Sequence, residues 1–225
     1  MEIKIRYIKF IFDSKKIFFP IFFIFKIIKA IKIFLNRELL NKIQFKNIRG
    51  HDFSIDGKYD LLVIYSLLNK YKPINILELG SGASTLVFAL YAREMKKKNI
   101  NVKFISLEEN GYYLAKTKEG LESINDDITN LELCGTIEKK TNNEYFINYD
   151  FNHTIAYDFV YIDGPVDNKK NINFICDDIN IISKNSNFTA LVDYRLKTYN
   201  YLRNKKSTYN CKFSFFNKSG LIFKA

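Results

Sequence analysis

Residues 75–86, Asn75-Ile-Leu-Glu-Leu-Gly-Ser-Gly-Ala-Ser-Thr-Leu86, decide how this chain is expected to fold. An apolar run over residues 74–79 contains a single acid, Glu78, and is followed by Gly80 and Gly82. Two hydroxyl residues come next, and after them apolar residues recur at helical spacing. This order predicts a strand, a tight glycine turn and the start of a helix.

The glycine turn is a candidate ligand site. Glycine permits positive φ and lets a ligand approach the backbone closely. The start of a helix offers unpaired N–H groups and a partial positive charge. Such a corner suits a small molecule with a negatively charged or polar group. The alternative is a turn that needs glycine only for packing.

Strand and helix signals alternate on both sides of this corner. Residues 59–71 are apolar at helical spacing and end before Pro73. Helices are expected over residues 84–98, 111–121 and 172–183, and strands over residues 102–107, 131–137, 159–162 and 188–192. Residues 138–155 are polar and rich in Asn, which indicates a loop or short meander, and residues 211–224 predict two strands joined at 217–220. The pattern predicts an α/β fold.

Length and composition fit one such domain with an N-terminal extension, since the chain has 225 residues. Its three cysteines are scattered, which argues against a disulfide framework and suits a reducing, cytoplasmic compartment. The chain has only two histidines, which lie far apart in the sequence. This argues against a histidine-rich metal site and against a Ser-His-Asp triad. Residues 47–57 read as a linker and divide a basic arm, residues 1–50, from a domain, residues 51–225.

The positive charge belongs mainly to the arm. Residues 1–50 carry nine Lys and three Arg against three acids, a net charge of +9 out of +11 for the whole chain. Lys26, Lys29 and Lys32 share one sector of a helical wheel, and Ile and Phe fill much of the remainder. This pattern predicts a basic amphipathic helix that lies on an anionic membrane surface through residues 15–35.

Other roles for the arm stay open. The apolar run of residues 17–25 is too short to span a bilayer, and the three lysines that follow it make a span costly. A secretory signal would need a small-residue cleavage site, which does not follow. The helix could instead pack on the domain or on a partner subunit. Nucleic acid would explain the charge but not the many Phe and Ile residues.

Acids stand at or near the ends of four expected strands: Glu78, Glu108, Asp163 and Asp193. Ligands of open α/β sheets bind outside the carboxyl ends of the strands, so these acids are expected to border one crevice. An acid at the end of the second strand can accept hydrogen bonds from a ribose diol. Glu108 is favoured for this role because it comes directly off the strand. Glu109 is the alternative, as is a purely structural role in capping the next helix.

With these residues placed, the chain resembles class I S-adenosylmethionine-dependent methyltransferases over residues 59–225. The likeness is to bacterial members, through Leu77-Glu-Leu-Gly-Ser-Gly-Ala-Ser-Thr85 and Ile162-Asp-Gly-Pro165. It implies a Rossmann-like seven-stranded sheet with helices on both faces, a last strand that runs antiparallel, and S-adenosyl-L-methionine as cofactor. The cofactor-binding residues it implies are Glu78, Gly80, Ser81, Gly82, Ser84, Glu108 and Asp163.

The chain departs from that family at two points. Ser84 stands where a third glycine is common, and Tyr194 replaces a second acid often found after the fifth strand. Metal-dependent O-methyltransferases place carboxylates after the fourth and fifth strands, where this chain has Asp163 and Asp193. These two carboxylates lack a third ligand, so no metal is expected.

The function expected from these residues is O-methyl transfer close to the inner membrane face, with a glycan, a lipid-linked molecule or a small molecule as acceptor. Asp163 is the expected general base, with Asp193 as the alternative, and Arg195 would hold an anionic acceptor. The second hypothesis is a membrane-associated, non-catalytic protein that keeps the fold. A nicotinamide-dependent enzyme is disfavoured because Thr85 stands where its third glycine would fall.

Overall fold

The structure is a computed structural model, and it describes residues 24–43, 54–152, 155–169, 172–182, 188–205, 209–214 and 219–223. Its helices are α2 (Arg37–Lys42), α3 (Ile55–Tyr71), α4 (Ala83–Lys96), α5 (Gly111–Ser123), α6 (Asp178–Ile182) and α7 (Leu196–Lys205). Residues 24–35 are also helical. Its longer strands are β1 (Asn75–Leu79), β2 (Lys103–Glu108), β3 (Thr129–Leu133), β4 (Thr136–Thr141), β5 (Glu144–Tyr149), β6 (Phe159–Ile162), β10 (Thr189–Asp193), β11 (Asn210–Ser214) and β12 (Ser219–Phe223). Three two-residue strands are β7 (Asn168–Lys169), β8 (Ile172–Asn173) and β9 (Ile175–Cys176).

Seven strands form the central sheet, in the order β11-β12-β10-β6-β1-β2-β3. Neighbours from β10 to β3 pair in parallel. The last strand, β12, runs antiparallel to both β10 and β11, so the chain closes with a hairpin inserted at the sheet edge. The predicted seven-stranded α/β fold with an antiparallel last strand is confirmed.

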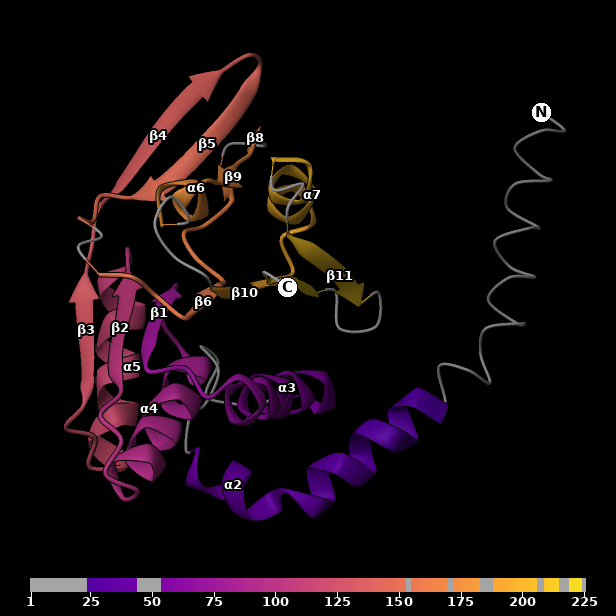
Figure 1. Ribbon diagram of the computed structural model, residues 1–225, viewed down its shortest axis with the longest axis vertical. Coiled ribbons are helices and arrows are strands. Elements are labelled where there is room, and N and C mark those ends of the chain that lie inside the picture. Colours follow the sequence, from indigo (N-terminus) through magenta and orange to yellow (C-terminus); the bar gives the residue numbers. More distant parts are fainter. Residues whose placement is uncertain are drawn as a thin grey trace, which may run out of the picture.

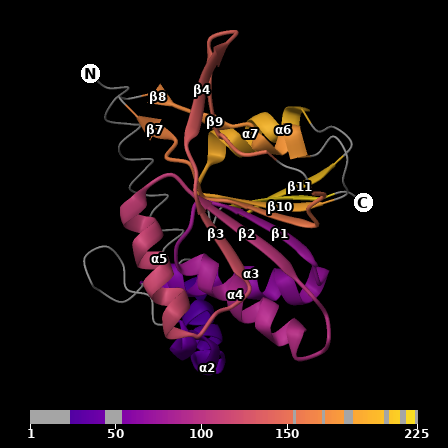
Figure 2. The same ribbon diagram turned by 90° about the vertical axis from the view of Figure 1, so that its left-hand side faces the viewer.

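Helices cover both faces of this sheet. Helices α3, α4 and α5 lie on one face and α6 and α7 on the other (Figures 1 and 2). The strands supply apolar side chains alternately to the two layers: Ile76, Phe104 and Phe159 to the α3–α4 side, and Leu77 and Leu107 to the opposite side. Because both faces are covered, the parallel strands are buried and read in sequence as continuous apolar runs.

The α3–α4 layer has an aromatic centre. The ring of Phe88 in α4 lies 5.2 Å from that of Phe104, 6.0 Å from that of Phe159 and 5.8 Å from that of Tyr161, measured between centroids. These tilted arrangements are ones that aromatic pairs favour. The contacts fix α4, and therefore the glycine turn before it, against β2 and β6, the strands on either side of β1.

Helix α3 begins four residues before its predicted start at residue 59. Helix α3 starts at Ile55 because the Ser54 hydroxyl accepts a hydrogen bond from the Gly57 N–H, at 3.2 Å. The helix ends at Tyr71, where Lys72 adopts a left-handed conformation before Pro73. Residues 44–53 lie outside the described residues, and so do residues 1–23 of the arm, so the proposed boundary stays a prediction.

Two other element assignments were wrong. Residues 136–149, expected to be part strand and part loop or meander, form the β4–β5 hairpin, which projects from the sheet (Figure 1). Residues 172–183 were expected to be one helix, but β8 and β9 occupy their first part and only α6 is helical. β9 pairs with β5, placing Ile175 opposite Phe146, and this tertiary pairing overrides the helical spacing.

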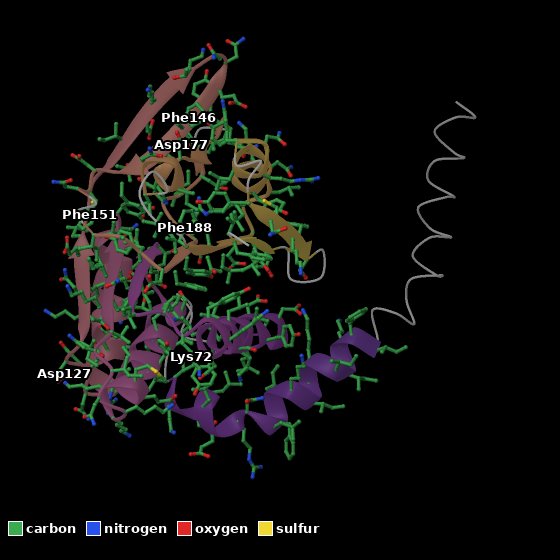
Figure 3. The ribbon with its side chains drawn as sticks, in the orientation of Figure 1. Lys72, Asp127, Phe146, Phe151, Asp177 and Phe188 are labelled. Carbon is green, nitrogen blue, oxygen red and sulfur yellow. The ribbon has the colours of Figure 1, made fainter. Side chains whose placement is uncertain are left out.

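Labelled residues in Figure 3 show which side of the molecule holds the amino ends of the parallel strands. Lys72 precedes β1 and Asp127 precedes β3, so both mark the amino ends of the strands, low in Figure 3. Phe146 and Asp177 lie in the upper layer formed by β5 and the segment before α6. Among the described residues, no helix has both the length and the apolar content needed to cross a bilayer.

Candidate functional site

The strand-end acids lie side by side at the carboxyl edge of the sheet. Strand register aligns Leu79 of β1 with Leu107 of β2 and Ile162 of β6, and aligns that same residue of β6 with Val192 of β10. The residues one position further along are Glu108, Asp163 and Asp193, on strands next to or one strand away from β1. Three of the four expected acids therefore lie at this edge of the sheet.

Two turns meet in backbone contact beside these acids. Gly80 has φ of +95°, and a Cβ at this position would lie 2.4 Å from the Gly164 nitrogen. A Cβ at Gly164 would lie 2.6 Å from the Gly80 Cα. The Asp163 N–H also donates to the Leu79 carbonyl at 2.8 Å. Only glycine fits at either point, so the turns after β1 and β6 form one rigid unit.

Glu78 organises the glycine turn from behind. It has no exposed surface, and its carboxyl oxygens accept hydrogen bonds from the hydroxyls of Ser84 at 2.5 Å, Thr85 at 2.6 Å and Ser106 at 2.7 Å. The Thr85 hydroxyl in turn accepts from the Gly82 N–H at 2.8 Å. Burial raises the pKa of Glu78 to about 7, against the lowering effect of the three hydroxyls. Ser84 is also buried, so in this conformation neither side chain lies open to a ligand.

Glu108 ties the glycine turn to β2. One carboxyl oxygen accepts from the Ser81 N–H at 2.9 Å and the Ser81 hydroxyl at 3.0 Å, and the other accepts from the Asn110 N–H at 2.9 Å. Only 4% of Glu108 is exposed, and burial raises its pKa. Gly82 is open by contrast, because nothing lies within 4 Å of the position its Cβ would occupy.

Glu109, the alternative to Glu108, has a different set of partners. It accepts from the Tyr149 hydroxyl at 2.6 Å and from the Val166 N–H at 2.8 Å. These contacts connect the end of β2 to β5 and to the segment after Pro165. The structure thus places Glu108 against the glycine turn and Glu109 against the turn after β6.

Arg195 holds the turn after β6. Its guanidinium donates to the Asp163 carbonyl and lies 3.9 Å from the Asp167 carboxylate. Only 7% of Arg195 is exposed, and its Nε and Nη1 atoms have no hydrogen-bond partner among the described residues. The buried guanidinium does not project into solvent, where an acceptor would arrive. The described contacts therefore place it as a support for Asp163.

Asp163 and Asp193 have strongly perturbed carboxyls. The Asp163 residue is exposed, yet desolvation by the surrounding protein, followed by repulsion from Asp193, raises its pKa to about 8. Arg195 opposes this rise. Desolvation raises the pKa of Asp193 to about 6, although the Tyr161 hydroxyl, which donates to it at 2.9 Å, lowers it. Acids with raised pKa values at a strand edge are typical of functional sites.

A small pocket on the α3 side connects Asp193 to a residue that sequence analysis missed. Its empty volume is about 200 Å³, including the part open to solvent. It is lined by Asp60, Val63, Ile64, Tyr161, Leu191, Asp193 and Ser219. Burial, and then repulsion from Asp193, raises the pKa of Asp60 to about 7.

Sequence offers little signal for Asp60 or Tyr161. Asp60 lies inside a helix, with no motif around it, and only the packing of α3 on the sheet brings it to Asp193. Tyr161 lies within an apolar strand, and nothing in the local sequence indicates that its hydroxyl reaches Asp193. Within the described ranges, no group of three or more His, Cys, Asp or Glu side chains is placed to hold a metal ion.

Comparison with known proteins places the fold. No protein-family model matches the chain, and no curated protein matches it. The structure resembles that of a putative O-methyltransferase from Klebsiella pneumoniae, with 14% sequence identity, 85% of this chain and 90% of that chain covered, and a TM-score of 0.53.

Two further solved structures are similar at lower scores. An O-methyltransferase from Bacillus cereus in complex with SAH has 13% identity and a TM-score of 0.49, over 77% of this chain and 83% of that chain. SAH-bound methyltransferase PaMTH1 from Podospora anserina has 15% identity and a TM-score of 0.48, over 74% and 78%. The chain thus has the Rossmann-like fold seen in the Klebsiella pneumoniae structure.

Proposed function

We propose that this chain is an S-adenosylmethionine-dependent O-methyltransferase. The observation that supports the proposal best is the rigid unit formed by Gly80 and Gly164, bordered by Glu108, Asp163 and Asp193 at one edge of the sheet. The names of the structurally similar proteins point the same way.

The residues at this edge fit the proposed cofactor in their chemistry. The open side of Gly82, next to the start of the 14-residue helix α4, leaves room for the methionine part. Glu108 would accept hydrogen bonds from the ribose hydroxyls, replacing those it accepts from Ser81. We assign Glu78 and Ser84 an indirect role in this binding, since both are sealed behind the turn and shape it.

The bound cofactor would supply an electrophilic methyl group on a sulfonium. The acceptor oxygen would take up this methyl group, and the bonding pair of the broken carbon–sulfur bond would stay on sulfur. The acceptor's proton passes to a carboxylate, for which we propose Asp163, with Asp193 as the alternative. The raised pKa of each makes it a stronger base than an ordinary carboxylate. Alignment of acceptor and methyl group supplies most of the remaining rate.

We further propose that the hydroxyl group of the acceptor is placed at the mouth of the pocket that holds Asp60 and Asp193. The Tyr161 hydroxyl and the two carboxyls offer hydrogen bonds, while Val63, Ile64 and Leu191 supply apolar walls. Arg195 acts as a positioning residue that holds the Asp163 turn. The acceptor is a glycan, a lipid-linked molecule or a small molecule that carries a hydroxyl group and is presented close to a membrane surface.

Isothermal titration calorimetry with S-adenosylhomocysteine tests the cofactor assignment. Wild type should bind, and Glu108→Ala should weaken binding at least about tenfold because a charge-assisted hydrogen-bond acceptor is lost. Glu119→Ala is the matched control, since Glu119 is an exposed residue of α5 paired with Lys116. Absence of heat from wild type would contradict the proposal.

One observation favours a second candidate function, a non-catalytic membrane-associated protein with this fold. Both carboxyl oxygens of Glu108 are already hydrogen-bonded within the chain. Incubation with methyl-labelled S-adenosylmethionine and cell-envelope fractions separates the two functions. A labelled product, lost in Asp163→Asn, supports the enzyme, whereas no label with any fraction supports the non-catalytic protein.

A further inference from the structure

The helix of residues 24–35 turns its basic side toward the domain. Lys29 is only 7% exposed, and its Nζ lies 2.7 Å from the Asp56 carboxylate in the first turn of α3. The same Nζ lies 5.0 Å from the centroid of the Tyr59 ring, and the Lys32 Nζ lies 5.6 Å from it. An ion pair and two cation–π contacts therefore hold this helix by the side that is usually solvated.

The opposite side of the same helix is apolar and exposed. At about 100° per residue, six side chains fall within a sector of about 120°. We call this set the outer stripe: Ile24 (54% exposed), Ile27 (45%), Ile28 (40%), Ile31 (52%), Phe34 (65%) and Leu35 (73%). A contiguous exposed apolar surface on a helix marks an interaction site. The helix lies along the outside of the domain (Figure 1).

Positive charge borders the outer stripe. Lys26, Lys32 and Arg37 are exposed, and no acid occurs between residues 24 and 37. The chain before the stripe continues the same chemistry, because residues 1–23 carry five Lys and Arg against two acids, a net charge of +3. Residues 17–23 are apolar throughout and lead directly into Ile24.

We propose that the outer stripe docks on an anionic bilayer surface, with the helix of residues 24–35 lying in the lipid interface. The apolar side chains enter the acyl boundary, and Lys26 and Arg37 reach the anionic headgroups. A second copy of the chain is a poorer occupant, because two such helices packed together would oppose cations with cations and offer no acid between residues 24 and 37.

Docking of this kind would place the pocket close to the lipid. The residue that binds Lys29, Asp56, lies one helical turn before Asp60, which lines the pocket. The docking itself does not depend on methyl transfer, so it can be tested, and can fail, separately from the proposed function.

Vesicle flotation of the full chain tests the proposal. Wild type should float with vesicles of equal parts phosphatidylglycerol and phosphatidylcholine, and less with phosphatidylcholine alone, because the charge attraction is lost. Ile31→Glu should reduce the floated fraction about tenfold by placing a charge at the centre of the stripe. Ala30→Glu is the matched control, with the same added charge on the neighbouring residue outside the stripe, and should float nearly as well as wild type. Equal loss in both variants would overturn the assignment of the stripe.

Fluorescence gives a second readout, because the chain has no Trp. The indole of Ile31→Trp should shift to shorter wavelength on addition of anionic vesicles and be quenched by brominated lipid. Tyr112→Trp, at an exposed position of α5, should show neither change. Two results would overturn the proposal: an Ile31→Trp emission already shifted without lipid, which means that protein covers the stripe, or a dimer in sedimentation that Ile31→Glu dissociates and that does not bind vesicles.

Discussion

Replacing Asp60 with Asn should stabilise the protein, and increasingly so as the pH rises. Asp60 lines the same pocket as Asp193, and its carboxyl is partly buried. The amide has nearly the same shape, so packing against α3 and the sheet is kept. What changes is that the variant has no carboxylate to desolvate.

The size of the effect follows from the pKa of Asp60, which burial and then Asp193 raise from 3.8 to about 7. Lys29 opposes the rise, Asp56 adds to it, and a hydrogen bond with Tyr194 lowers the value. At about 1.4 kcal/mol for each pH unit, the full difference corresponds to at most about 4 kcal/mol. Solvent reaches the pocket and screens the charges, so we expect about 1–2 kcal/mol.

The direction of this pH dependence follows from whether the native or the unfolded state holds the Asp60 proton. Between about pH 4 and pH 7 the native state keeps the Asp60 proton that the unfolded chain has lost. The native state then binds more protons, so the stability of wild type falls through this range and is constant above it. The Asp60→Asn variant has no carboxyl at this position and does not lose stability in this way. Its free energy of unfolding should exceed that of wild type by nearly zero at about pH 4 and by about 1–2 kcal/mol at about pH 8.

Urea unfolding followed by circular dichroism at a series of pH values measures this difference. Asp127→Asn is the control, because Asp127 is an exposed acid whose pKa is lowered by its hydrogen bond and ion pair with Lys96. That variant should gain nothing as the pH rises. If the advantage of Asp60→Asn is independent of pH, or shrinks toward alkaline pH, the assignment of a desolvated carboxyl pair is refuted.

Three further substitutions test the site. Glu78→Gln should lower the free energy of unfolding by about 1–3 kcal/mol in urea, because one buried hydroxyl loses its acceptor, and an unchanged midpoint would contradict its role behind the turn. Tyr161→Phe should raise the pKa of Asp193, followed by carbon-13 NMR of the labelled carboxyl, since the lost hydrogen bond lowers that pKa. Gly164→Ala should lower the stability by about 1–3 kcal/mol or more in thermal unfolding, because its methyl would overlap the turn after β1, whereas Gly82→Ala, with open space, should change little.

The parallel core of the sheet was predictable because its strands are buried on both faces. β6 was placed at its actual bounds, and β1, β2 and β10 within one residue at either end, since apolar runs between turn residues leave few alternatives. The β4–β5 hairpin was not recognised, because β4 is exposed along most of its length and has no apolar alternation. The segment before α6 forms a strand because β9 pairs with β5, and a local sequence pattern cannot indicate a partner so far away in the chain.

The site was predictable to the extent that it depends on strand ends. Topology alone brings Glu108, Asp163 and Asp193 to one edge, because parallel strands end together. Spacing could not show that three hydroxyls enclose Glu78, which depends on side-chain packing around it. The spacing of residues also could not predict that Asp60 lies near Asp193, because this depends on how α3 packs across the sheet.

The main-chain contact between Gly80 and Gly164 has a consequence for protein engineering. Two loops that touch without an intervening side chain cannot be diversified one at a time, since any bulk added to one displaces the other. A combinatorial library aimed at new ligands should therefore leave both glycines fixed and vary outward positions such as Val166. Selection from a library that randomised all three would return both glycines unchanged.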